Sequence, residues 1–163
     1  MRKKDPARQR SQTLERTQRF LGQFDEMLGT QLAQDPERTL VAAADRDSAA
    51  LGLVRIAEAC QQNDINLRQL LDESPILLNR LIIVSGGSEA TVDHLVRWPQ
   101  VIPTLADAPD FIDSCASTPE ELENTFTQAL ADQDSVLTGE QGITALRRTY
   151  RDLVTRLVVQ DLE

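Results

Sequence analysis

The chain has 163 residues, of which 40% are hydrophobic, 26% are charged and only 4% are aromatic, and its formal net charge is −9. This composition is typical of a single globular domain whose core consists mainly of Leu, Val, Ile and Ala, which suits packed helices better than a β-sandwich. The acidic balance argues against nucleic acid as a partner, and no apolar run reaches the roughly 20 residues that span a bilayer, which argues against a membrane.

The first part of the chain reads as a polar tail followed by a helix. Residues 1–12 are predicted to be a flexible polar tail, as chain termini often are. The basic start MRKKDPARQR is not followed by an apolar segment, so it is not expected to be a secretory signal. From Thr13 a helical pattern begins, with apolar residues at three- and four-residue steps: Leu14, Phe20, Phe24, Met27 and Leu28. Asp35-Pro36 then predicts a new helix start, since proline is tolerated in the first turn.

The middle of the chain predicts a series of short helices with recognisable ends. A strongly helical run covers residues 47–62, and Asn66 can cap the short helix that follows. Ser74-Pro75 predicts the next start, with Ser74 as the capping side chain, and the nearly apolar run 76–84 should be deeply buried.

The junction after that run combines two glycines with a serine. Gly86 is expected to take the left-handed conformation just past the helix, and Ser88 to cap the following helix from Glu89 to Trp98. That second helix carries the sole histidine of the chain, His94.

The last third predicts short turns and then two longer helices. Prolines restrict residues 99–117 to short helical turns, and Thr118 to Glu121 has the form of a capping box that opens a helix. Residues 135–139 break that helix, and Thr138 with Gln141 opens the final one. The inward apolar stripe of the final helix is expected to be Ile143, Leu146, Tyr150, Leu153, Val154, Leu157 and Val158.

No segment alternates in the strand period, so the sequence predicts an all-α fold. We expect an irregular helical bundle of about six to eight helices, with no nucleotidyltransferase sheet, forming a single domain over residues 13–163.

The Gly86-Gly87-Ser88 turn imitates a phosphate-binding loop. Nucleotidyltransferases of the polymerase-β type follow such a turn with Asp-x-Asp on a strand, where paired carboxylates hold Mg²⁺. Here the next acidic pattern is Asp93-His94-Leu95, which lacks the second carboxylate and lies in a predicted helix. The sequence therefore favours a helix break over a phosphate site.

The remaining candidates for chemistry also favour structural roles. Two literal Asp-x-Asp triplets, 45–47 and 132–134, lie at predicted helix boundaries, where aspartate is common as a cap. His94 and Asp93 diverge by about 100° on a helix and form no catalytic dyad, so His94 is expected to be a structural or surface histidine. Cys60 and Cys115 have no metal-ligand spacing and are expected to be free buried thiols. We therefore assign no catalytic, cofactor-binding or metal-binding residue.

The last predicted helix contains several arginines. Arg147, Arg148 and Arg151 cluster over about one turn. One interpretation is a solvated flank that pairs with nearby acids, and the other is a contact surface for another domain or an acidic partner.

Two segments carry a resemblance to a known family. The first is LLDESPILLNRLIIVSGGSEATVDHLVRWPQ, with the apolar helix Leu77 to Val84, the break Gly86 to Ser88, and then Asp93, His94, Leu95, Val96 and Pro99. The second is ALRRTYRDLVTRLVVQDL, with Leu146, Arg147, Tyr150, Arg151, Asp161 and Leu162. In this order they resemble the early region of the bifunctional glutamine synthetase adenylyltransferase/adenylyl-removing enzymes, over roughly residues 50–163. The second glycine in Ser85-Gly86-Gly87 departs from the family pattern.

The resemblance implies that the chain is the N-terminal helical portion of a much longer enzyme. Family members resemble two nucleotidyltransferase units, one removing AMP from a tyrosine of glutamine synthetase by phosphorolysis and one attaching AMP from ATP. Both units use Mg²⁺ held by an Asp-x-Asp motif. The first of these motifs follows the helix matched by residues 143–162, so the resemblance implies that no family catalytic residue maps onto this chain.

The implied cofactors, Mg²⁺ and ATP, therefore belong to the full-length parent. The implied partners are the downstream nucleotidyltransferase domain of the same polypeptide and glutamine synthetase, and the implied compartment is the cytoplasm. The alternative is a standalone helical protein-interaction module.

Overall fold

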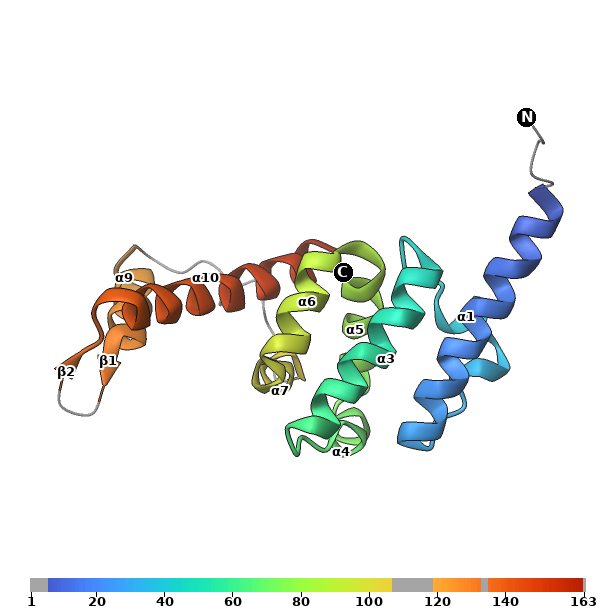
Figure 1. Cartoon of the computed structure of the whole chain (residues 1–163), viewed down its shortest axis with the longest axis horizontal. Helices are drawn as coiled ribbons and strands as arrows, with labels where there is room; N and C mark the ends of the chain where they lie inside the picture. The colour runs from blue at the N-terminus through green and yellow to red at the C-terminus, as the bar shows by residue number, and fades with distance from the viewer. Residues whose placement is uncertain (1–5, 107–118, 133–134, 163) are drawn as a thin grey trace. The chain divides into compact units, whose positions relative to one another are not determined.

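The computed structural model describes residues 6–106, 119–132 and 135–162 (Figure 1). The chain divides into two compact units, the first built from Met1–Asp107 together with Leu162–Glu163 and the second from Ala108–Asp161. The predicted all-α fold is confirmed, with seven helices of seven residues or more in the described ranges. A single domain over 13–163 stays a prediction, because two compact units can belong to one domain or to two.

In the first unit, the elements within residues 6–106 are all helices. Its elements are, in chain order, α1 (Pro6–Leu28), η1 (Leu32–Gln34), α2 (Pro36–Thr39), α3 (Arg46–Gln62), α4 (Leu67–Glu73), α5 (Pro75–Gly87), α6 (Glu89–Arg97), η2 (Pro99–Val101) and α7 (Ile102–Ala106).

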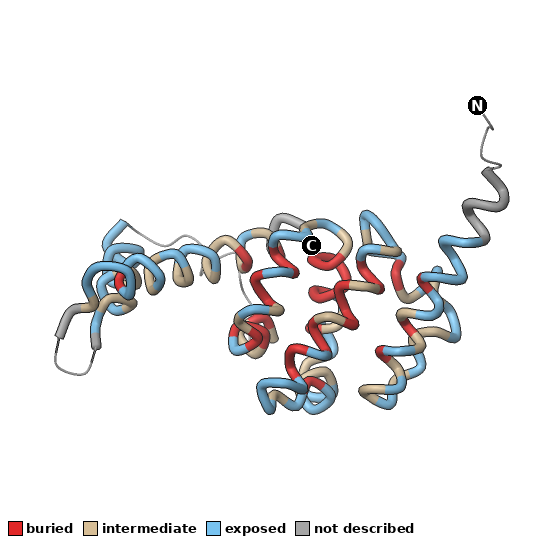
Figure 2. The backbone as a smooth tube through the Cα atoms, viewed as in Figure 1, coloured by how far each residue is buried: buried red, intermediate tan, exposed pale blue. Residues whose placement is uncertain are grey.

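Helix α3 is the centre of the first unit. It packs against α1 on one side and against α5 and α6 on the other, as Figure 1 shows. Its small residues Ala49 and Ala50 and its larger Leu53 and Ile56 are fully buried, so neighbouring helices approach on both sides. The buried residues of α5 and α6 complete this core (Figure 2).

Local capping explains where these helices begin. Asp35 accepts a hydrogen bond from the backbone N–H of Arg38, and Asn66 accepts one from Gln69. Ser74 is an exception to the predicted caps, because its hydroxyl donates to the carbonyl of Ala106 at 3.2 Å and makes no capping bond to α5. The serine therefore ties the start of α5 to the end of α7.

Helix α1 differs from the prediction at its start and in its buried face. It begins at Pro6, inside the predicted tail, because proline fits the first turn and Ala, Arg and Gln that follow are good helix formers. Leu21 and Phe24 are buried, whereas Leu14 is exposed. Helix α1 packs on α3, and the apolar period alone did not show where along its length that packing takes place.

The second unit contains two helices joined by a small ribbon. They are α9 (Pro119–Leu130) and α10 (Gly139–Leu162), and between them Ala131–Asp132 (β1) pairs antiparallel with Ser135–Val136 (β2). The predicted break at 135–139 thus starts earlier, at Ala131. The predicted turns around Pro109 and the cap at Thr118 lie outside the described residues.

Few of the described residues of the second unit are buried. No residue of α9 is buried, and its Leu122 remains 37% exposed. Figure 2 shows α9 and α10 mostly in the exposed and intermediate colours. Within the described ranges, no helix combines the length and apolar character needed to cross a membrane.

Candidate functional site

The Gly-Gly-Ser segment forms the tight junction between α5 and α6. Ser88 caps α6, since its hydroxyl oxygen accepts a hydrogen bond from the N–H of Thr91 at 3.3 Å. Gly86 does not take the predicted left-handed conformation, because α5 continues through Gly87. A Cβ at Gly86 would lie 2.8 Å from the Cβ of Ala43 and 3.0 Å from the carbonyl oxygen of Asp45. Glycine is needed here for close packing.

A cavity of about 270 Å³ lies between α3 and this junction, lined in part by Arg55, Glu89 and the buried Ser85. Its charged groups are one guanidinium and one carboxylate. Arg55 is also engaged by Asp93, at 2.6 Å between Nη2 and Oδ1. The cavity therefore lacks the excess of cationic donors that a triphosphate requires.

His94 and its neighbour Asp93 point in different directions. His94 is buried on the inner face of α6, whereas Asp93 is exposed and pairs with Arg55 of α3. The imidazole and the carboxylate therefore form no catalytic dyad, and the expectation of a structural histidine agrees with its position in the core.

The two carboxylates of the first Asp-x-Asp triplet have different structural roles. Asp45 caps α3, since its Oδ1 accepts a hydrogen bond from the N–H of Ser48 at 2.7 Å. Asp47 faces α1, where its Oδ2 lies 3.4 Å from Nη1 of Arg16. In the second triplet Asp132 belongs to β1, and Asp134 lies outside the described residues. Among described residues, no three His, Cys, Asp or Glu side chains gather as a metal site would require.

The cap at Asp45 gives a testable prediction. Hydrogen bonds from the Ser48 backbone and hydroxyl hold the pKa of Asp45 below its ordinary value of 3.8. Asp45→Ala should lower the free energy of unfolding by about 1 kcal/mol at pH 7, whereas Asp45→Asn keeps the cap and should change little.

The pH dependence of this loss has a definite sign. A carboxyl with a lowered folded-state pKa contributes stability above its unfolded pKa and loses that contribution as the pH falls through the folded pKa. Urea unfolding at pH 7 and at about pH 3 should therefore show a smaller difference between wild type and Asp45→Ala in acid. A difference that grows in acid would contradict the assignment.

Of the two cysteines, the structure describes one. Cys60 is buried in α3, and burial raises the pKa of its thiol to about 11. This thiol is unreactive at neutral pH, as a structural role requires. Cys115 lies outside the described residues.

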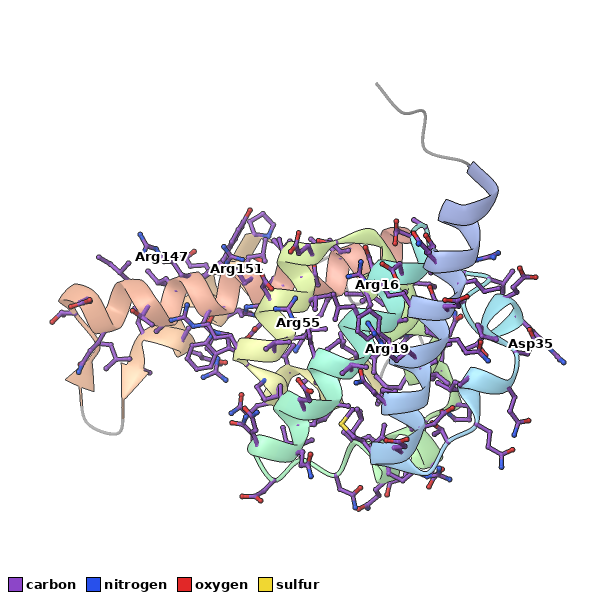
Figure 3. All side chains as sticks on the ribbon, turned by 45° about the vertical axis from the view of Figure 1, so that its right-hand side comes forward. Arg16, Arg19, Asp35, Arg55, Arg147 and Arg151 are labelled. Atoms are coloured by element: carbon purple, nitrogen blue, oxygen red, sulfur yellow. The ribbon has the colours of Figure 1, made fainter. Side chains whose placement is uncertain are left out.

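The arginines predicted as a contact surface differ in their surroundings. Arg148 is half-buried and lies 4.0 Å from Asp152, one turn along α10. Arg147 and Arg151 are exposed and have no ion pair among the described residues. Figure 3 shows both of them projecting from α10.

Part of the apolar stripe of α10 that the sequence predicted to face inward is exposed. Ile143, Tyr150 and Leu157 are 50%, 61% and 49% exposed. Their seven-residue spacing places them in one row along the helix, and Arg147 and Arg151 follow one flank of that row. We call these five residues the α10 seam. The sequence pattern identified the apolar row but not its exposure, because periodicity does not say whether a partner is present.

Relatives of the chain share one description. The chain is 33% identical over 124 residues to the bifunctional glutamine synthetase adenylyltransferase/adenylyl-removing enzyme of Mycolicibacterium smegmatis, and 31% identical over 116 residues to that of Nocardia farcinica. The chain is homologous to part of this family of bifunctional enzymes. The match to the enzyme of Streptomyces avermitilis is 47% identical over a shorter stretch of 64 residues, which is 37% of the chain and 6% of the relative.

The homology covers much of the chain but little of each adenylyltransferase. The first two matches span 76% and 71% of this chain but only 12% and 11% of the relatives. No protein-family profile and no solved structure matches the chain.

Proposed function

We propose that the chain is the N-terminal helical portion of an enzyme resembling glutamine synthetase adenylyltransferase/deadenylylase, and that this portion is not itself catalytic. Its role is to act as a scaffold and to contact the downstream nucleotidyltransferase domain of the same polypeptide, with glutamine synthetase as a second candidate partner. In this proposal Mg²⁺ and ATP are bound by other parts of the longer enzyme, and the chain acts in the cytoplasm, as the resemblance implies.

The observation that carries the proposal is the contrast between the carboxylates and the α10 seam. Asp45, Asp47 and Asp93, the described carboxylates of the candidate motifs, are each engaged in a cap or an ion pair of the first unit. The α10 seam, in contrast, leaves apolar and cationic side chains uncovered. Such a surface suits contact with another protein or domain better than chemistry.

The absence of catalysis is tested with adenylylated and unmodified glutamine synthetase. The purified chain, supplied with Mg²⁺ and phosphate or with Mg²⁺ and ATP, should neither release nor attach AMP above a blank without protein. The full-length relative from Mycolicibacterium smegmatis, assayed in parallel, is the positive control. Turnover by the chain alone would overturn the proposal.

A magnesium titration provides a second readout that does not depend on activity. Amide resonances of Asp45, Asp47 and His94 should show no saturable shift as Mg²⁺ is added, because their side chains have structural partners or lie in the core. Saturable shifts confined to these residues would instead support an independent metal-dependent enzyme.

The standalone interaction module remains the alternative, and the α10 seam is equally compatible with it. The genomic reading frame distinguishes the two. Continuation into a Gly-Gly and Asp-x-Asp segment after Glu163 supports the longer enzyme, and a natural stop codon supports the module.

A further inference from the structure

The cavity between α3 and the α5–α6 junction contains a buried serine hydroxyl that has no partner. Ser85 is only 3% exposed, and among the described residues nothing hydrogen-bonds to its Oγ. Its side chain lies over Gly52 of α3, where a Cβ would come within 2.8 Å of Oγ, and both residues line the cavity. A buried hydroxyl without a partner costs free energy. The cavity therefore favours a polar ligand atom beside Ser85.

The other polar groups around the cavity are mostly hydrogen-bond donors. The hydroxyl oxygen of Ser88 accepts from the N–H and the hydroxyl of Thr91, at 3.3 and 2.8 Å, so its own proton is available. Arg55 contacts Asp93 through Nη2 and has further N–H groups on its guanidinium (Figure 3). The first N–H groups of α6 have no acceptor in the helix and add partial positive charge. Together these donors suit a small anion.

The rest of the lining limits the charge and the size of that anion. Glu89 is exposed at the first position of α6 and lines the cavity, so its carboxylate repels a ligand with a second negative charge. Leu51 and Val92 supply apolar surface on the α3 and α6 sides. A volume of about 270 Å³ is smaller than most pockets that hold drug-sized molecules. A ligand with one negative charge and a short carbon chain matches all three limits.

We propose that this cavity binds a small aliphatic monocarboxylate. Ser85 and Ser88 donate to its carboxylate oxygens, Arg55 supplies the opposite charge, and Leu51 and Val92 cover its carbon chain. The inference goes beyond the proposed function and does not depend on it, because every residue that lines the cavity belongs to the first unit.

An NMR titration of the whole chain with sodium propionate tests the proposal. Sodium chloride is replaced stepwise by the propionate salt, so that the ionic strength stays constant. Amide resonances of residues 85–89 should shift saturably, with a dissociation constant on the order of 1 mM for so small a ligand. Succinate, with its second carboxylate, should bind on the order of fivefold more weakly. Glu89→Gln should reduce that preference, since it removes the repelling charge.

Two substitutions separate the ligand contact of Arg55 from its ion pair. Arg55→Met should weaken propionate binding about tenfold or more, because the charge opposite the carboxylate is lost. Asp93→Asn is the matched control. It breaks the same ion pair but keeps the guanidinium, so it should bind propionate at least as tightly as wild type.

The unpartnered hydroxyl has its own test. Ser85→Ala should weaken propionate binding by about threefold to tenfold, whereas its thermal midpoint without ligand should not fall, because a buried hydroxyl without a partner is removed. A lower midpoint would show that the hydroxyl already has a partner and would overturn the assignment.

Three titration results would also overturn the proposal. The first is a set of shifts that stay linear up to about 100 mM, which would indicate adventitious binding only. The second is unchanged affinity in Arg55→Met, and the third is succinate binding as tightly as propionate. Circular dichroism of each variant checks that its helix content matches that of wild type.

Discussion

Gly52→Leu should lower the free energy of unfolding of the first unit by about 3 kcal/mol, because overpacking a core of this density costs about 1 to 3 kcal/mol and the new side chain meets two buried side chains of neighbouring helices. A Cβ at Gly52 of α3 would lie 2.7 Å from the Cβ of Ser85, 2.8 Å from its hydroxyl oxygen and 3.3 Å from Cγ2 of Val92. Both Ser85 and Val92 are buried, so neither can move aside without displacing α5 or α6.

The matched control is a second helical glycine with open surroundings. A Cβ at Gly22 of α1 would meet nothing within 4 Å. Gly22→Leu should therefore leave stability unchanged or raise it by about 0.5 to 1 kcal/mol, because leucine is the better helix former. Chemical denaturation of both variants, followed by circular dichroism, measures the contrast. Equal midpoints for the two variants would contradict the close approach of α3 to α5 and α6.

Arg80→Met should destabilise the first unit by about 2 to 3 kcal/mol, since a buried carbonyl then loses a charge-assisted hydrogen bond. Arg80 of α5 is only 3% exposed, and its Nη1 donates to the carbonyl oxygen of Leu105 in α7 at 2.7 Å. Methionine has a similar length and apolar character, so the substitution removes the donor with a small change in packing.

The control for the charge itself is Arg38→Met at an exposed position of α2. This substitution removes an exposed guanidinium that has no side-chain hydrogen bond or ion pair among the described residues, and it should change stability by less than about 0.5 kcal/mol. Thermal unfolding of the two variants beside wild type gives the comparison. An Arg80→Met variant as stable as Arg38→Met would show that the bond between α5 and α7 contributes nothing.

Helix starts could be predicted from the sequence wherever the capping chemistry is local. Asp35, Asn66 and Ser88 each accept a hydrogen bond from the backbone N–H three residues later, as their positions before helical runs indicate. These contacts need no knowledge of the rest of the fold. The all-α class follows from the same local patterns, from the low aromatic content and from the lack of segments in which apolar and polar residues alternate as they do in a strand.

The sequence-based predictions were wrong where the role of a residue depends on a contact with a residue far away in the sequence. Ser74 has the sequence of a cap, yet its hydroxyl donates to Ala106, 32 residues away. Gly86 has the sequence of a helix terminator, yet its role is to let α5 approach Ala43. Local propensity contains no information on such tertiary contacts, so these side chains could only be placed once the packing was known.

The candidate site shows the same division. The sequence alone was sufficient to exclude a catalytic dyad of Asp93 and His94. The two residues are adjacent on a helix, so their side chains point in directions about 100° apart. The exposure of Tyr150 could not be predicted, because an apolar row looks the same whether it faces its own core or a partner. That distinction depends on elements that lie elsewhere in the chain or outside it.

The hydrogen bond from the backbone N–H of Asp45 to the carbonyl oxygen of Gly86, at 3.2 Å, also has a consequence for the order of folding. It joins the residue before α3 to the end of α5, so it closes a segment that contains α3, α4 and α5. Closing a loop of this length has an entropic cost that local helix formation does not share. The bond therefore forms late, after α5 has docked on α3, and thereafter opposes the separate loss of any one of the three helices.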